Sequence, residues 1–276
     1  MKVDLNRIIE AAEYIQSAIS GIPKFCVVLG SGLGGFADNL EERVEIPFSE
    51  IPHFPESTVE GHKGRLVVGM IDNIYIMAMQ GRFHYYEGYS MAEVAFPIRC
   101  LLYLKVENLI VTNAAGSVDP AITPGDIMVI RDHIKLHGDS PLRGVNIDSF
   151  GPRFNDMSDP YPKRVRELTC ECGKELGIEL KEGVYFYMPG PSYETAGEIK
   201  AINILGANAV GMSTVPEVIV AVHGGMQVLG LSCITNMGTG MRNQVVDHQE
   251  VIVRGEASAA KLMALLRLVI TRWPTL

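Results

Sequence analysis

An arginine and a histidine two residues apart form the clearest chemical pair in the sequence. In "GRFHYYEGYS", residues 81–90, Arg82 and His84 fall on one side of an extended segment, because successive strand side chains point to opposite faces. A guanidinium fork beside an imidazole suits a phosphate dianion. Tyr86 continues the same side. Packing against Glu87 at an interface is the alternative, and this segment alone leaves both interpretations open.

A glycine-rich turn could supply the rest of a phosphate site. In "FCVVLGSGLGGF", residues 25–36, an apolar segment runs into the spacing Gly30-x-Gly32-x-x-Gly35. The backbone N–H groups of such a turn, together with the hydroxyl of Ser31, could hold a single phosphate. A purely structural turn is the alternative, because glycine is common wherever the backbone needs a positive φ.

Two nucleotide-binding motifs fit this turn poorly. A dinucleotide fold needs a full helix after the turn and then a second strand that ends in an acidic residue. Here Pro47, Pro52 and Pro55 crowd the place where that strand should lie. A Walker loop also fails, because no Gly-Lys-Ser/Thr follows.

The cysteines do not predict a metal site. Cys26, Cys100 and Cys233 sit inside apolar runs, which favours burial as small hydrophobic residues. Cys170 and Cys172 form C-x-C without a second ligand pair, so packing is favoured over zinc binding. We expect reduced thiols, as in a cytosolic protein.

The elements that must position these residues alternate between strands and helices. Apolar, strand-like segments cover residues 24–30, 65–71, 73–81, 107–117, 125–134, 183–190, 208–212 and 226–236. Helical patterns cover residues 1–16, 90–104, 162–177, 194–206, 215–225 and 247–273. This order predicts an α/β fold: a single domain over residues 1–276, with a central twisted sheet flanked by helices. The longest predicted loop runs from Leu136 to Tyr161.

Six strand-like segments end in small or polar residues: "LGSGLGG", "MQGRFHYYEG", "VTNAAGS", "YMPGPSYET", "VGMSTVPE" and "CITNMGTG". The carboxyl ends of strands line the ligand crevice of open α/β sheets. We therefore expect these six endings to converge on one site.

Composition narrows the class of partner. The chain has 276 residues, 47% of them hydrophobic, and a formal charge of -8. Its length and apolar content suit a sizeable core. No run of lysine and arginine suggests a nucleic-acid or membrane surface, and no apolar run reaches membrane-spanning length. The charged N-terminus does not resemble a signal peptide, so we expect a cytoplasmic protein.

Seven motifs together resemble one enzyme family. They are "LGSGLGG", "EGHKGRLV", "QGRFHYYEGY", "VTNAAGSV", "GPSYETAGE", "VGMSTVPEVIVA" and "CITNMGTG", in this order from end to end of the chain. The set is similar to purine nucleoside phosphorylases of the low-molecular-mass, homotrimeric class. The resemblance implies a mixed sheet of the nucleoside phosphorylase fold. It also implies phosphorolysis of purine ribonucleosides or 2'-deoxyribonucleosides to free base and α-ribose 1-phosphate, with phosphate as co-substrate and neither metal nor organic cofactor.

The resemblance assigns roles to individual residues. The implied phosphate-binding residues are Ser31, His62, Arg82, His84, Ala114 and Ser213. The implied nucleoside-binding residues are Tyr86, Phe150, Tyr193, Glu194, Met212, Asn236 and His248. His84, Glu194 and Asn236 are the implied catalytic residues. The carboxylate of Glu194 would accept a hydrogen bond from purine N1–H, and the amide of Asn236 would donate a hydrogen bond to N7.

The family pattern also predicts assembly and base preference. The resemblance implies a homotrimer in which Phe150 of one subunit contacts the sugar bound by its neighbour. Phe154 would take this place if the loop register differs. Glu194 and Asn236 imply a preference for inosine and guanosine. Related methylthioadenosine phosphorylases place aspartate at the base, and Asn236 argues against that class. A catalytically silent binding protein is the third interpretation. The glycine-rich stretch "MGTGMRNQVVDHQE", which contains His248, departs from the family pattern.

Overall fold

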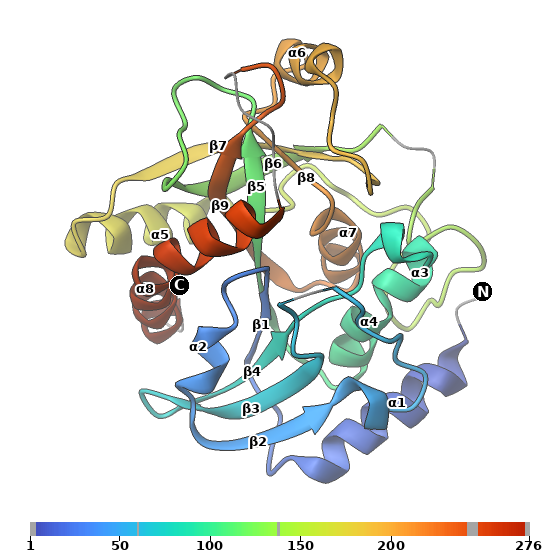
Figure 1. The fold of residues 1–276 in the computed structure, drawn as a ribbon. Helices are drawn as coiled ribbons and strands as arrows, with labels where there is room; N and C mark the ends of the chain where they lie inside the picture. The colour runs from blue at the N-terminus through green and yellow to red at the C-terminus, as the bar shows by residue number, and fades with distance from the viewer. Residues whose placement is uncertain (1–3, 60, 137–138, 242–247, 274–276) are drawn as a thin grey trace.

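One sheet of parallel and antiparallel strands forms the centre of the molecule, with helices around it (Figure 1). The computed structural model describes residues 4–59, 61–136, 139–241 and 248–273, and for residues 248–252 and 254–257 it describes the backbone alone. Within this part of the chain the strands are β1 (Phe25–Leu29), β2 (Glu41–Pro47), β3 (Arg65–Ile71), β4 (Ile74–Gln80), β5 (Asn108–Ser117), β6 (Ile127–Ile134), β7 (Leu180–Tyr187), β8 (Ala209–Gly211) and β9 (Gln227–Met237). The helices are α1 (Leu5–Ala18), α2 (Gly35–Asp38), α3 (Met91–Val94), α4 (Phe96–Tyr103), α5 (Lys163–Glu175), α6 (Ala196–Ile204), α7 (Val215–His223) and α8 (His248–Arg272).

The sheet closes on itself at one end. Its strand order is β2-β3-β4-β1-β5-β8-β7-β6-β9, and β9 also pairs with β5. The strands β5, β8, β7, β6 and β9 therefore form a ring, while β1 to β4 extend as an open wing. Parallel and antiparallel pairs are both present, so the predicted mixed α/β fold is confirmed. The closure itself was not predicted, because apolar runs do not specify which strands pair.

One strand was missed by the sequence analysis. β2 lies antiparallel to β3 at the edge of the sheet, with a register shift between Glu41 and Val44. Most of its side chains are exposed, so it lacks the apolar run that identified the other strands. Pro47 is its last residue, a position where the missing N–H is tolerated. The turn after β1 opens only the four-residue α2, in agreement with the argument against a dinucleotide fold.

The predicted helix over residues 90–104 is two helices. Ser90 caps α3 by accepting a hydrogen bond from the backbone N–H of Glu93. The chain turns at Ala95, and Pro97 lies in the first turn of α4, where a proline N–H would have no partner in any case.

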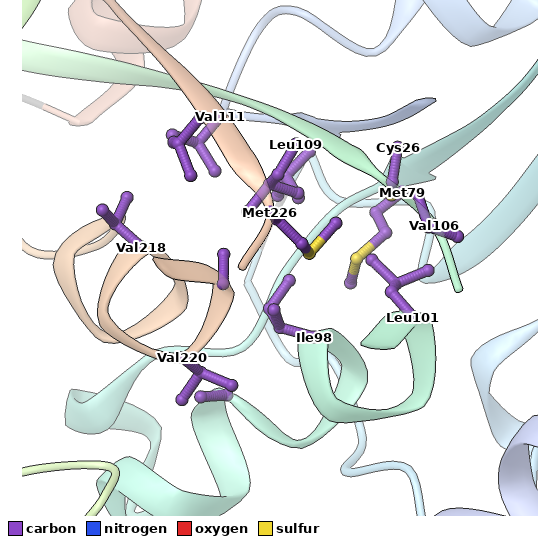
Figure 2. Packing of buried hydrophobic residues seen from close by; sticks show 14 of the residues in the cluster. Cys26, Met79, Ile98, Leu101, Val106, Leu109, Val111, Val218, Val220 and Met226 are labelled. Carbon is purple, nitrogen blue, oxygen red and sulfur yellow. The ribbon is translucent and has the colours of Figure 1, made fainter. Parts of the chain in front are cut away.

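Helices cover both faces of the sheet and bury a core against each. One core joins α1, α4 and α7 to the strands, and the other joins α2, α5 and α8 to the opposite face. Alternate residues of one strand enter different cores, as Leu109 and Ile110 of β5 do. Figure 2 shows part of the first core, where Ile98 and Leu101 of α4 lie near Met79 and Met226. The predicted burial of Cys26, Cys100 and Cys233 is confirmed.

Candidate active site

The six predicted strand endings do converge on one cavity of about 530 Å³. Eleven of the predicted site residues line it: Ser31, His62, Arg82, His84, Tyr86, Ala114, Tyr193, Glu194, Met212, Ser213 and Asn236. They follow β1, β4, β7 and β8 or lie within β5 and β9, and His62 precedes β3. Residues up to about 200 positions apart in sequence are thus gathered by the sheet.

The glycine-rich turn brings Ser31 to the cavity. Gly30 is pressed against β5, since a Cβ built on it would lie 2.8 Å from the Cα of Asn113. Its N–H donates to the Thr112 hydroxyl at 3.1 Å. Gly32 has a φ of 76°, and the N–H of Leu33 closes the turn onto the carbonyl of Gly30. Glycine is therefore needed at two positions for different reasons: close approach at Gly30 and a left-handed backbone at Gly32.

Arg82 reaches the cavity from a buried ion pair. It is 1% exposed, and its Nε and Nη2 donate to the two carboxylate oxygens of Glu217 at 3.0 and 2.8 Å. Nη1 donates to the carbonyl of Thr112 at 2.5 Å and lies 3.5 Å from the hydroxyl oxygen of Ser213. The guanidinium is therefore held in one orientation before any ligand arrives.

Ser213 is presented by a strained turn. The next residue, Thr214, has φ 75° and ψ -58°, and the N–H of Val215 donates to the carbonyl of Ser213 at 2.8 Å. These values define a γ-turn of the rarer, positive-φ kind. Asn113 holds it by donating to the Thr214 hydroxyl at 2.9 Å. Strain of this sort persists where the surroundings fix it and is common at functional sites. Here it places Ser213 directly before α7, whose N-terminus favours an anion.

Three aromatic rings stack along one wall. The ring of His84 lies between those of His62 and Tyr86. Its centroid is 5.5 Å from the centroid of His62 and 4.6 Å from that of Tyr86. The Nδ1 of His84 is 2.9 Å from a carboxylate oxygen of Glu87, which also accepts from the backbone N–H of His84. Nδ1 is therefore the protonated nitrogen, and Nε2 is left for a ligand. Ser31 connects to this wall, since its hydroxyl oxygen is 3.5 Å from Nε2 of His62.

Burial keeps both imidazoles neutral. It lowers the pKa of His62 to about 3, with the neighbouring His84 and Arg82 adding to the effect. Burial also lowers the pKa of His84, against the opposing influence of Glu87. Burial alone would raise the pKa of Glu87, but hydrogen bonds from His84 and Thr58 outweigh it and lower that pKa to about 2. At neutral pH this part of the cavity holds neutral histidines between Arg82 and the Glu87 carboxylate.

The other end of the cavity offers an acceptor and a donor. Glu194 is 7% exposed, and burial raises the pKa of its carboxyl group. The Oδ1 of Asn236 accepts from the Thr235 hydroxyl at 2.9 Å, and its Nδ2 donates to the carbonyl of Met237 at 3.1 Å. Nδ2 therefore has a second N–H that it can donate to a ligand, and Oδ1 keeps one lone pair that can accept.

Glycines leave room for the side chains between the two ends. Gly190 has a φ of 64°, and a Cβ there would lie 2.4 Å from the Met212 sulfur and 3.2 Å from the Tyr86 ring. Gly116 lies opposite Asn236, where a Cβ would be 3.1 Å from Nδ2. Met212 and Tyr86 can therefore approach each other across Gly190, at the place predicted for the sugar.

Phe150 and His248 are not brought into the cavity. Phe150 is half-buried and lines a separate hollow with Arg99 and His223. Phe154 is 89% exposed. α8 begins at His248, but the side chain of this residue lies outside the described part of the chain. The sugar contacts of Phe150 and His248 therefore remain predictions.

Two acidic residues that hold Arg82 and His84 in place were not predicted from the sequence. Glu87 was considered only as a packing partner, although its spacing of three residues from His84 suits a contact within one turn. Glu217 pairs with Arg82 across 135 residues. The only local signal for it was an acidic residue in the first turn of a predicted helix.

Two observations bear on metals and membranes. In the described ranges, no group of three or more His, Cys, Asp or Glu side chains could hold a metal ion. All five cysteines are free thiols, including Cys170 and Cys172. Among the helices that the structure describes, none is long and apolar enough to cross a membrane.

Comparison with known proteins places the chain in a family. The model of the phosphorylase superfamily matches residues 24–271, so the chain belongs to that superfamily. Purine nucleoside phosphorylase 1 of Geobacillus stearothermophilus is 49% identical over 95% of this chain and 95% of its own length. Purine nucleoside phosphorylase of Bos taurus is 45% identical over 96% of this chain and 94% of its own. Within the superfamily, the chain is a member of the purine nucleoside phosphorylases.

Solved structures agree with this placement. One is the crystal structure of a schistosoma purine nucleoside phosphorylase in complex with hypoxanthine. Its sequence is 36% identical to this one, and the two structures superpose with a TM-score of 0.92 over 97% of each chain. Isoform 2 of the Schistosoma mansoni enzyme, solved with cytosine and ribose-1-phosphate, matches with a TM-score of 0.93 at 39% identity, covering 98% of this chain and 97% of that one. The predicted nucleoside phosphorylase fold is confirmed.

Proposed function

We propose that this enzyme catalyses the reversible phosphorolysis of purine ribonucleosides and 2'-deoxyribonucleosides. The products are the free base and α-ribose 1-phosphate or its deoxy counterpart. One observation carries the proposal: a single cavity holds an oxyanion end, with Ser31, Arg82, His84 and Ser213, and a base end, with Glu194 and Asn236. A phosphate and a nucleoside can therefore lie in it together. Inorganic phosphate is the co-substrate, and the proposal requires no metal or organic cofactor.

The proposed mechanism places charge at the two ends of the cavity. As the purine leaves C1', the ribosyl group becomes oxocarbenium-like, as in glycoside cleavage. Phosphate on the opposite face of the sugar supplies negative charge and then attacks C1'. The free Nδ2–H of Asn236 stabilises the charge that arrives at N7. No protein nucleophile is needed. The contacts accelerate the reaction to the extent that they tighten in the transition state.

Base choice follows from Glu194. A 6-oxopurine carries a proton on N1, and neutral adenine has a lone pair there. Adenosine would therefore leave the buried carboxylate of Glu194 without a donor, which is costly in a site built around that hydrogen bond. We accordingly propose that inosine and guanosine are the preferred substrates. A Schistosoma mansoni relative has been solved in complex with adenosine, so binding alone is not the relevant measurement.

We further propose a homotrimer in which Phe150 completes the sugar site of a neighbouring subunit. The position of Phe150 outside its own cavity is compatible with this arrangement. The cytoplasmic location expected from the sequence remains a prediction.

Dependence on phosphate is the experiment for the proposed function. Inosine should be cleaved when phosphate or arsenate is supplied. Arg82→Ala should raise the KM for phosphate and lower kcat, because it removes the fixed guanidinium from the oxyanion end. Rapid hydrolysis of inosine in phosphate-free buffer would contradict the proposal and identify a nucleosidase.

A further inference from the structure

The buried partner of Arg82 has a geometry that goes beyond charge neutralisation. Glu217 lies in the first turn of α7, is 2% exposed, and is absent from the residues that line the cavity. Both of its carboxylate oxygens are engaged by Arg82, at 3.0 Å to Nε and 2.8 Å to Nη2. A two-point contact of this kind fixes the plane of a guanidinium as well as its position.

The remaining donors of Arg82 face a defined direction. A guanidinium has five N–H donors. Glu217 takes one from Nε and one from Nη2, and the carbonyl of Thr112 takes one from Nη1. The second Nη1–H is directed at the hydroxyl oxygen of Ser213, which lies 3.5 Å from Nη1 on the cavity wall. The remaining donor is the second N–H of Nη2.

The same contact works against phosphate binding in purely Coulombic terms. Glu217 cancels the charge of Arg82, and Glu87 adds a second carboxylate near the cavity. Among the described residues, the charges at the oxyanion end of the cavity therefore sum to no excess positive charge. An oxyanion there must be held by directed hydrogen bonds. Removing the charge of Glu217 would tighten phosphate binding if charge alone mattered. It would weaken binding if orientation mattered more.

We propose that Glu217 is a positioning residue for phosphate, which holds Arg82 so that one Nη1–H and one Nη2–H point into the oxyanion end of the cavity. This inference rests on the proposed function, because it assumes that the oxyanion end receives phosphate. α7 links the parts of this arrangement, since it carries Glu217 in its first turn directly after Ser213 and the strained Thr214. One short segment therefore orients the hydroxyl and, through Glu217, the guanidinium.

Two substitutions at Glu217 test the proposal. Glu217→Gln keeps the shape but presents one N–H group to the donors of Arg82, so the two-point contact is lost. Glu217→Asp keeps the charge but is one methylene shorter. Misplacing a binding group by about 1 Å can cost on the order of a hundredfold. We expect kcat/KM for phosphate to fall by about that factor in Glu217→Gln and by about tenfold in Glu217→Asp. The KM for inosine should change by less than about threefold.

A variant at a second, more exposed ion pair controls for the loss of a carboxylate partner of arginine. Glu182 pairs with Arg166 at 2.6 Å, away from the cavity residues. Glu182→Gln should leave the KM values for phosphate and inosine unchanged. An unchanged or lower phosphate KM in Glu217→Gln would overturn the proposal, and so would equal losses for phosphate and inosine. Failure of both Glu217 variants to fold would also overturn it, because Glu217 would then be a structural partner alone.

Calorimetry with inorganic phosphate, in the absence of nucleoside, separates this inference from the proposed function. Weaker phosphate binding by Glu217→Gln than by the unmodified protein would support the positioning role even if inosine were not cleaved. Cleavage of inosine that does not need phosphate would contradict the proposed function alone. Equal phosphate affinity of the two proteins would contradict the role of Glu217 alone.

Discussion

At the scale of single residues, His84 sets which protonation state of phosphate the site can bind. Its Nδ1–H is paired with Glu87, so Nε2 of the neutral ring is an acceptor. A phosphate oxygen can approach Nε2 closely only with a proton between them, and the hydroxyl group of HPO4²⁻ supplies that proton. Burial lowers the pKa of His84, so the ring is neutral at neutral pH. Binding of the phosphate dianion to the neutral ring therefore takes up no proton from solvent.

Phosphate affinity should therefore be nearly independent of pH between roughly pH 8 and pH 9, where the dianion predominates and His84 is neutral. The KM for phosphate, measured at saturating inosine over this range, is the appropriate quantity. Glu87→Gln should raise the phosphate KM by weakening the hydrogen bond that fixes Nδ1. A phosphate KM that rises about tenfold per pH unit over this range would show that binding takes up a proton, and would contradict the proposed contact.

The amide of Asn236 belongs to the same scale. Asn236→Asp should improve 6-aminopurines, because a carboxyl group can accept from the 6-amino hydrogens and, when protonated, still donate to N7. In the unmodified enzyme, kcat/KM for inosine should exceed that for adenosine by at least about a hundredfold. The ratio should narrow in the variant. Comparable values for adenosine and inosine in the unmodified enzyme would show that Glu194 and Asn236 do not select the base.

Sequence reasoning reached some of these residues and not others for a physical reason. Arg82 and His84 could be paired from their spacing along one strand end. Glu217 could not, because its contact with Arg82 exists only once the fold brings the first turn of α7 to the segment that follows β4. The roles of Glu194 and Asn236 came from family resemblance, since nothing local distinguishes a buried acceptor from a charge near a helix start.

At the scale of elements, the turn after β1 depends on a glycine pressed against β5. A Cβ on Gly30 would meet backbone atoms of Asn113 and Thr112 at 2.8 and 3.0 Å, and neither can move independently of the strand. Gly30→Ala should lower the free energy of unfolding by about 1–3 kcal/mol through overpacking. It should also raise the KM for phosphate, because Ser31 is the next residue.

The same turn offers a matched control. Gly35 begins α2, and a Cβ there would meet nothing within 4 Å. Gly35→Ala should change stability by no more than about 0.5 kcal/mol and leave the phosphate KM unchanged. Denaturant unfolding and steady-state kinetics on the two variants give the comparison. Equal effects of both substitutions would show that close approach at Gly30 is not what the turn requires.

The elements themselves were largely predictable. Eight strands carry apolar runs long enough to identify them, whereas β2 is charged and exposed. The chain divides into α3 and α4 just before Pro97, which lies in the first turn of α4. The apolar spacing continues across this break, so it predicted one helix. The pairing of β5 with β9 could not be foreseen, because it depends on how strands far apart in sequence meet.

At the scale of the whole molecule, the proposed trimer predicts that the cavity is incomplete within one chain. Phe150 packs against the protein's own core rather than against its own cavity. Phe150→Ala should raise the KM for inosine by about tenfold and leave the phosphate KM nearly unchanged, because it removes an aromatic contact of the sugar. Sedimentation velocity with activity measured on each species tests the assembly. A fully active monomer would contradict it.

The central claim is that one cavity joins a nucleoside to phosphate, and the identity of the sugar product tests it most directly. Inosine and phosphate are incubated with the enzyme, and hypoxanthine, ribose 1-phosphate and free ribose are quantified together. The two ends of the cavity predict one ribose 1-phosphate for each hypoxanthine and no free ribose, because phosphate and not water attacks C1'. Hypoxanthine released with an equal amount of free ribose would contradict the account.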